Sequence, residues 1–170
     1  MAWFRVDNRL VHGQVIEGWL PYLDARVLIV INDALAVDEL QQQIMQLAIP
    51  ARIQVRFMSV ANAQNICGDP VLQAADSMFL FANCQDVVRF VEQGGCVPLL
   101  NIGNMHYSSG KRQLCAHVAV SEDDQACFTF LQARGIELDF RCVPGAVPET
   151  NLRDQETKAN SGSPTLTAKK

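Results

Sequence analysis

Between residues 7 and 14 the sequence gathers side chains that could bind or accept a phosphoryl group. Asp7, Arg9 and His12 fall within six residues, and Gly13 and Gln14 follow directly. A neutral imidazole has a free lone pair near pH 7, so His12 is a candidate nucleophile. The planar guanidinium of Arg9 suits phosphate oxygens, whereas a carboxylate facing phosphate is repelled. We therefore expect Asp7 to orient the site rather than to act as a general base.

Each of these residues also has a purely structural interpretation. A histidine in a turn can simply bond to nearby backbone, and Arg9 can lie on the surface in solvent. Gln14 could donate to phosphate or be solvated, and the sequence does not separate these possibilities. Gly13 is best explained by a close backbone approach or by a positive φ angle.

The stretch lies between two elements that would position it. Residues 2–6 alternate like a short strand, and apolar residues then recur at helical spacing from Val15 to Leu23. The stretch is therefore predicted to be a strand-to-helix turn. In an open α/β sheet, such turns open at the carboxyl edge of the strands, where ligands bind and where backbone N–H groups favour an anion.

Strand and helix patterns alternate along the rest of the chain. This alternation predicts a single α/β domain with an open, mostly parallel twisted sheet of about six to seven strands and helices on both faces. Val37, Leu40, Ile44 and Leu47 recur at steps of three or four and predict a helix that ends before Pro50. Further strands are expected at residues 26–31, 53–57, 77–81, 97–102, 115–120 and 136–140.

Right-handed crossovers would bring several other loops to the edge that holds His12. Asn32 and Asp33 follow the second strand, and Ser59 follows the third. Each could contact a bound phosphate, but helix capping explains all three at least as well. Of the two other histidines, His106 lies in the predicted fifth loop and His117 inside the predicted strand 115–120. His106 could be a second relay histidine, whereas His117 is expected to be structural.

Composition excludes several classes of function. The chain has 170 residues, 49% of them hydrophobic, and a formal net charge of −4, with no basic patch that would favour nucleic acid. No apolar run reaches membrane-spanning length and no signal peptide is evident, so we expect a cytoplasmic protein. The six cysteines form no C-x-x-C pair and are expected to be buried thiols. No metal site or cofactor is predicted.

The domain is expected to occupy residues 1–148. Residues 149–170 contain only Leu152 and Leu166 as large apolar side chains. Such a segment cannot bury enough surface to offset the entropy lost on ordering, so it is predicted to be a flexible polar tail.

Residues 4–15, Phe-Arg-Val-Asp-Asn-Arg-Leu-Val-His-Gly-Gln-Val, resemble the signature of the IIB components of the bacterial phosphotransferase system (PTS), mannose/fructose/sorbose family. The resemblance continues through residues 31–33, 80–83, 101–105 and 133–138 and spans about residues 3–143. Asn8 and Asn104 depart from the family pattern, which usually has Asp at the first position and often Gly at the second.

The resemblance implies a cytoplasmic phosphocarrier. His12 would accept a phosphoryl group from the phosphohistidine of a IIA partner and pass it to a sugar held by the membrane subunits IIC and IID. The family also implies a homodimer. An alternative is a regulatory domain that binds partners according to its phosphorylation state without sugar transport. A nucleotide-binding α/β module is disfavoured because no glycine-rich fingerprint is present.

Overall fold

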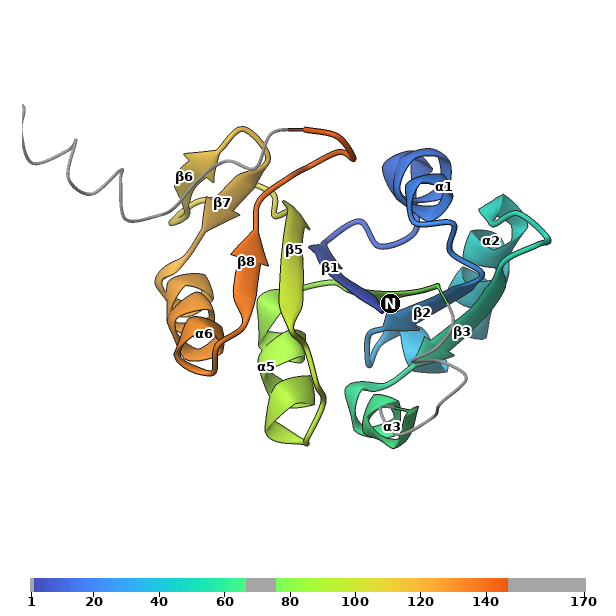
Figure 1. Ribbon diagram of the computed structural model, residues 1–170, viewed down its shortest axis with the longest axis horizontal. Coiled ribbons are helices and arrows are strands. Elements are labelled where there is room, and N and C mark those ends of the chain that lie inside the picture. Colours follow the sequence, from blue (N-terminus) through green and yellow to red (C-terminus); the bar gives the residue numbers. More distant parts are fainter. Residues whose placement is uncertain (1, 67–75, 147–170) are drawn as a thin grey trace, which may run out of the picture.

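The computed structural model describes residues 2–66 and 76–146. Figure 1 shows a twisted sheet with helices on both of its faces. The main sheet has six strands in the order β3-β2-β4-β1-β5-β8, and all of its pairings are parallel. The predicted fold class is thus confirmed. The predicted domain end at residue 148 and the predicted tail 149–170 lie outside the described residues.

The strands follow the apolar runs of the sequence closely. The central strands β2 and β4 are buried at every position, as expected for parallel strands covered on both sides. The strands of the main sheet are β1 (Trp3–Asp7), β2 (Val27–Ile31), β3 (Gln54–Met58), β4 (Ser77–Phe81), β5 (Leu99–Asn104) and β8 (Glu137–Asp139).

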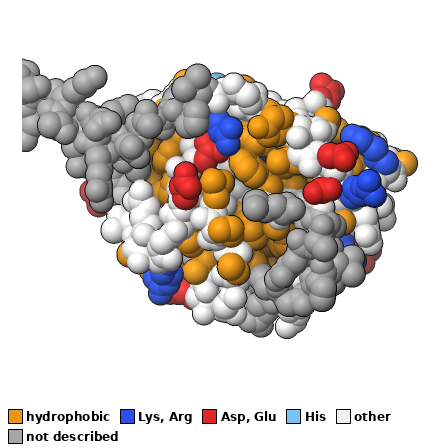
Figure 2. All heavy atoms as spheres, in the orientation of Figure 1, with side chains coloured by type: hydrophobic (Ala, Val, Ile, Leu, Met, Phe, Trp, Pro, Cys, Tyr) orange, Lys and Arg blue, Asp and Glu red, His pale blue; other side chains and the backbone are white. Residues whose placement is uncertain are grey.

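A separate hydrophobic cluster covers each face of the sheet. One cluster packs under α3 (Val60–Ala63), α5 (Cys84–Glu92) and α6 (Glu122–Ala133). The other lies under the segment that follows β1 and the segment that follows β2. Figure 2 shows hydrophobic side chains gathered in the middle of the face drawn, over β1 and β5. No helix in the described part of the chain is long and apolar enough to span a bilayer.

The helix after β1 begins as a π-helix. This wider turn, η1, spans Gln14–Trp19 and continues into the short α-helix α1 (Leu20–Tyr22). Val15, Trp19 and Leu20 are fully buried, so the apolar spacing correctly predicted a helical segment. Single π-turns occur mainly at functional sites. Here the π-turn directly follows His12.

The prediction of one strand over residues 115–120 is wrong. The chain reverses at Ala116 and His117, and two short strands, β6 (Arg112–Cys115) and β7 (Val118–Val120), pair antiparallel as a hairpin outside the main sheet. An apolar run alone does not reveal a tight turn inside it, because the turn depends on pairing with the preceding polar residues. His117 is therefore an exposed turn residue rather than a strand residue.

The second predicted helix is present, but the apolar residues that indicated it do not meet the sheet. Helix α2 (Glu39–Ala48) follows a 3-10 turn, η2 (Leu35–Val37), and no residue of α2 is buried. Val37, Leu40, Ile44 and Leu47 are exposed rather than packed against the sheet. Half-buried Met45 contacts the core from another side of the helix. Periodicity identified the helix, but it could not tell which partner the apolar side chains would meet.

Helix α6 begins with a capping box. Ser121 accepts a hydrogen bond from the Asp124 backbone N–H, and Asp124 accepts one from the Ser121 backbone N–H. Asp124 also accepts from Gln85 and pairs with Lys111 at 3.0 Å. Burial favours the neutral acid, but the donors of Ser121, Gln85 and Lys111 outweigh it and lower the pKa of Asp124 to about 2.

We predict that Asp124→Asn lowers the free energy of unfolding at pH 7 by about 1–2 kcal/mol. A carboxylate with a lowered pKa stabilises the fold above its unfolded pKa, and this contribution is lost as the pH falls through the folded pKa. The stability difference between wild type and variant should therefore shrink between about pH 4 and pH 2. Urea unfolding across this range measures it. Asp123→Asn, an exposed neighbour in the same turn, is the control; an equal effect in both variants would contradict the assignment.

Candidate functional site

The turn that carries His12 lies where the connections of two neighbouring strands separate. The segment after β1 packs on one face of the sheet, whereas the helix after the adjacent strand β4 packs on the other. This divergence at the carboxyl ends of parallel strands leaves a crevice where α/β proteins bind ligands. The structure thus places residues 7–14 at the expected edge.

A buried carboxylate joins His12 to a buried arginine. The side chain of Asp7 is fully buried, and its Oδ2 lies 3.0 Å from His12 Nε2 and 2.8 Å from Arg5 Nη2. Its Oδ1 accepts a hydrogen bond from the Arg9 backbone N–H. Asp7 therefore links the strand to the turn, and its negative charge is balanced inside the protein by Arg5.

The hydrogen bonds of His12 select one tautomer. The backbone N–H of Gln14 donates to Nδ1 at 3.2 Å, so this nitrogen carries a lone pair. The proton therefore resides on Nε2, which donates it to Asp7. The His12 side chain is 15% exposed, so the ring is held in place yet reachable from outside.

Arg9 and Gln14 interact above the turn. Arg9 Nη2 donates to Gln14 Oε1 at 2.7 Å, and Arg9 Nε lies 3.7 Å from Asp7 Oδ1. The Arg9 side chain remains 40% exposed. A guanidinium held by its neighbours but open to solvent can offer its remaining N–H groups to an incoming anion.

Arg5 is a site residue that the sequence interpretation missed. It is fully buried and donates to Asp7, to the Asn101 side chain and to the Cys142 carbonyl. Its guanidinium carbon lies 5.0 Å from the centre of the Trp19 ring. Burial lowers the pKa of Arg5, and Asp7 opposes this effect. The sequence did carry one signal of this contact, because residues 5 and 7 of the same strand point to the same face of the sheet.

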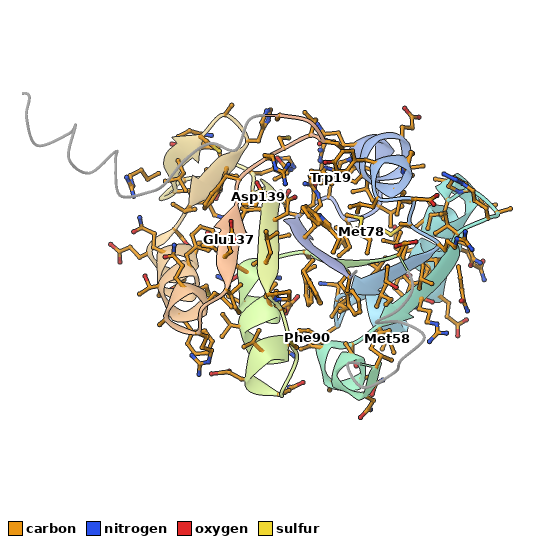
Figure 3. The ribbon with its side chains drawn as sticks, viewed as in Figure 1. Trp19, Met58, Met78, Phe90, Glu137 and Asp139 are labelled. Carbon is orange, nitrogen blue, oxygen red and sulfur yellow. The ribbon has the colours of Figure 1, made fainter. Side chains whose placement is uncertain are left out.

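Residues far apart in the sequence complete the surroundings of Arg5. Trp19 Nε1 donates to the Cys142 carbonyl at 3.1 Å, and Asn101 Nδ2 donates to Asp139. Figure 3 shows Trp19 coming from the segment after β1 and Asp139 from the end of β8. The Cys142 thiol also lies 3.7 Å from Gln14 Nε2. The last strand and the chain after it therefore help to hold the turn.

The positive φ angle expected at Gly13 is absent there. Gly13 has a φ of −51°, and a Cβ atom at this position would meet nothing within 4 Å. The residue in the left-handed region is Leu10, with a φ of 52°. Such a conformation is uncommon for a bulky residue and marks local strain in the turn. Buried packing of the Leu10 side chain holds it there.

The three loop residues predicted at this edge, Asn32, Asp33 and Ser59, bond to other parts of the domain. Asn32 Oδ1 accepts from the Leu35 backbone N–H at the start of η2, and Ser59 Oγ accepts from the Asn62 backbone N–H in α3. Asp33 accepts from the Val60 backbone N–H and pairs with Arg89 of α5 at 2.6 Å. Capping, the structural alternative for all three, accounts for the backbone contacts, and Asp33 adds an ion pair with α5.

Asn8 and Asn104, which depart from the family pattern, bond to each other. Asn104 Nδ2 donates to Asn8 Oδ1 at 2.8 Å, and the Asn8 backbone N–H donates to the Asn104 carbonyl at 3.1 Å. The pair ties the turn to the end of β5. Asn8 also lines a cavity of about 260 Å³ together with Ala82, Asn83, Gln85, Met105, Lys111, Ser121 and Asp124.

The other candidate ligands do not extend the site. His106 lies exposed in the loop after β5, and His117 lies exposed in the hairpin turn. Among the described cysteines Cys84 and Cys142 are buried, whereas Cys96 is exposed rather than buried as predicted. Burial raises the pKa of both the Cys84 and the Cys127 thiols, which keeps them protonated.

Comparisons with known proteins show the family to which the chain belongs. The sequence matches the family of PTS system sorbose subfamily IIB components over residues 1–162. The PTS sorbose-specific EIIB component of Klebsiella pneumoniae is 34% identical over 151 residues, which cover 89% of this chain and 92% of that protein. The N-acetylgalactosamine-specific phosphotransferase enzyme IIB component 1 of Escherichia coli strain K12 is 35% identical over 145 residues, or 83% and 89% of the two chains.

A solved structure is similar as well. The crystal structure of the IIBSor domain of the Klebsiella pneumoniae sorbose permease matches with a TM-score of 0.81 and 32% identity, covering 92% of this chain and 95% of that one. The chain belongs to the sorbose subfamily of PTS IIB components, as the sequence motifs predicted. Its relatives are components of sugar-specific phosphotransferase systems, which supports a role in phosphoryl transfer.

We predict that Gly103→Ala destabilises the protein by about 3 kcal/mol or more. An added Cβ at this position in β5 would overlap the Arg5 guanidinium and push it away from Asp7. Thermal unfolding measures the effect. Gly13→Ala is the matched control, because a Cβ there meets open space and the φ angle suits alanine. Equal stability of Gly103→Ala and wild type would show that the Arg5 side chain has room to move.

Proposed function

We propose that the chain is a phosphocarrier whose nucleophile is Nδ1 of His12. In this proposal a phosphohistidine of a IIA partner donates the phosphoryl group. The bond from phosphorus to the donor nitrogen breaks as the bond to Nδ1 forms. A sugar hydroxyl held by the membrane subunits IIC and IID then attacks the same phosphorus, loses its proton and releases His12.

The contact between Asp7 and His12 Nε2 carries the proposal. It directs the proton to Nε2 and leaves the lone pair on Nδ1, where the acceptor nitrogen needs it. A buried carboxylate at Nε2 also stabilises the positive charge that develops on the ring as Nδ1 attacks phosphorus. Arg5 pairs with the same carboxylate at 2.8 Å and balances its charge in the interior.

The turn offers hydrogen-bond donors for the oxygens of the transferred phosphoryl group. The Gln14 backbone N–H, which now bonds to Nδ1, can turn to a phosphate oxygen once Nδ1 is phosphorylated. Arg9 can place two N–H groups on the same phosphate. Phosphoryl transfer depends mostly on positioning and on stabilising charge on the equatorial oxygens, and these groups meet that need. Asp7 orients the ring without facing the phosphate.

The relatives suggest the partners. The mannose-specific EIIAB component of Escherichia coli strain K12 is 34% identical over 154 residues, which cover 91% of this chain but 47% of that protein. The designation EIIAB joins a IIA component to a IIB component in one protein, which supports a IIA protein as phosphoryl donor. We further propose that the protein works in the cytoplasm, on the side of the membrane where phosphoryl donors form, and that two copies associate.

We predict that His12→Ala abolishes phosphorylation and leaves the fold intact, because the ring lies on a partly exposed turn. The wild-type chain is incubated with labelled phosphoenolpyruvate, the upstream phosphotransferase proteins and a IIA protein, and the label should be acid-labile and base-stable. Phosphorus NMR should assign it to Nδ1. His106→Ala and His117→Ala are the controls and should keep full labelling.

Label that persists in His12→Ala would exclude this nucleophile, and label on Nε2 would exclude the role given to Asp7. A labelled chain that never supports sugar phosphorylation by IIC and IID would instead favour the regulatory alternative.

We predict that Arg9→Lys slows phosphoryl transfer roughly tenfold, because a single ammonium replaces a bidentate guanidinium. Rapid-quench measurement of transfer from the IIA phosphohistidine gives the rate. Arg52→Lys, an exposed arginine after α2, is the control and should transfer at the wild-type rate. An unchanged rate for Arg9→Lys would remove Arg9 from the phosphate site.

A further inference from the structure

Helix α2 and the turn before it present an apolar stripe to solvent. The stripe consists of Val37, Leu40, Ile44 and Leu47, whose exposed fractions are 83%, 66%, 52% and 88%. Leu40, Ile44 and Leu47 recur at steps of four and three, so they lie on one side of α2, and Val37 belongs to the turn that precedes the helix. We call these four residues the α2 stripe.

The stripe is not the side by which the helix attaches to the domain. Half-buried Met45 packs against the hydrophobic cluster on that face of the sheet, together with buried Ile49 after the helix. Gln42 donates to the Leu35 carbonyl at 2.8 Å. The helix is therefore anchored elsewhere, and the stripe is available to another molecule.

The area of the stripe suits an interface between two proteins. Together its four side chains expose roughly 500 Å² of apolar surface, which is near the largest patch that soluble monomers usually leave bare. If the same patch were covered on two molecules, about 1,000 Å² would be buried, the lower limit for a specific interface. One patch packed on a second copy of itself therefore reaches the required size.

The polar residues around the stripe favour a second copy over a charged partner. Within α2 the only charged side chain is Glu39, at the first position, and the helix contains four glutamines whose amides can both donate and accept. Exposed Arg52 follows the other end of the helix. If two α2 helices packed antiparallel, Glu39 of each copy would approach Arg52 of the other.

We propose that two copies of this chain associate through the α2 stripe, with their α2 helices antiparallel about a twofold axis. This inference rests on the association of copies proposed above and names its surface. No residue of the turn 7–14, which we call the phosphate turn, belongs to the α2 stripe. Loss of the dimer should therefore leave phosphorylation of isolated His12 measurable, and the two proposals can fail separately.

The test is sedimentation velocity of the full chain over a concentration series. Leu40→Glu and Leu47→Glu should each raise the dimer dissociation constant about tenfold or more, because two carboxylates would be buried against apolar side chains. Tyr107→Glu is the matched control. Tyr107 is 68% exposed, close to the 66% of Leu40, but it lies in the loop after β5. Circular dichroism should show unchanged folding in all three variants.

A charge exchange tests the antiparallel arrangement. Glu39→Arg and Arg52→Glu should each weaken the dimer, and the double variant should restore it. Within one chain the two residues lie at opposite ends of a helix about 15 Å long, so restoration would require contact between copies. A wild-type chain that stays monomeric at every concentration would overturn the proposal, as would a dimer unaffected by Leu40→Glu and Leu47→Glu.

A monomeric chain whose stripe variants fail to bind vesicles carrying IIC and IID would instead assign the stripe to the membrane subunits. That result would also overturn the proposal. Labelling of the stripe variants at His12, measured in parallel, separates any of these outcomes from a failure of the phosphocarrier function.

Discussion

The buried ion pair between Arg5 and Asp7 is the interaction on which the site depends. A lone carboxylate would not remain charged in this interior, and removing one partner of such a pair typically costs about 3–5 kcal/mol. Arg5 pairs with Asp7 at 2.8 Å, and Asp7 in turn accepts a hydrogen bond from His12 Nε2 at 3.0 Å. The pair therefore converts a turn histidine into an oriented base with its free lone pair on Nδ1.

The arginine can occupy the interior only because several elements make room for it. Gly103 leaves space for the Arg5 guanidinium, and Asn101 and the Cys142 carbonyl accept its hydrogen bonds. The guanidinium carbon lies over the Trp19 ring, 5.0 Å from its centre. These residues come from β5, from the chain after β8 and from the π-turn after His12. The proposed nucleophile is consequently held by most of the domain, although the residues proposed to act on phosphate lie within eight consecutive positions.

The two functional surfaces place different demands on the fold. The phosphate turn needs rigid support below and an open side above, and the diverging connections of β1 and β4 provide both. The α2 stripe needs only a helix anchored by another side, and Met45 and Ile49 provide that anchor. In the proposed carrier, an association surface away from His12 leaves that residue free to meet a donor and an acceptor in turn.

The sequence by itself determined the strands of the main sheet, the turn and the candidates His12, Arg9 and Asp7, because local spacing acts over a few residues. It also indicated the family. Tertiary structure alone decided that Arg5 lies beneath Asp7, that Leu10 rather than Gly13 takes the positive φ angle, and that residues 115–120 turn back as a hairpin. It likewise left the α2 stripe in solvent. Periodicity shows that a helix or strand has an apolar side and a polar side. Only the packed chain determines which partner each side meets.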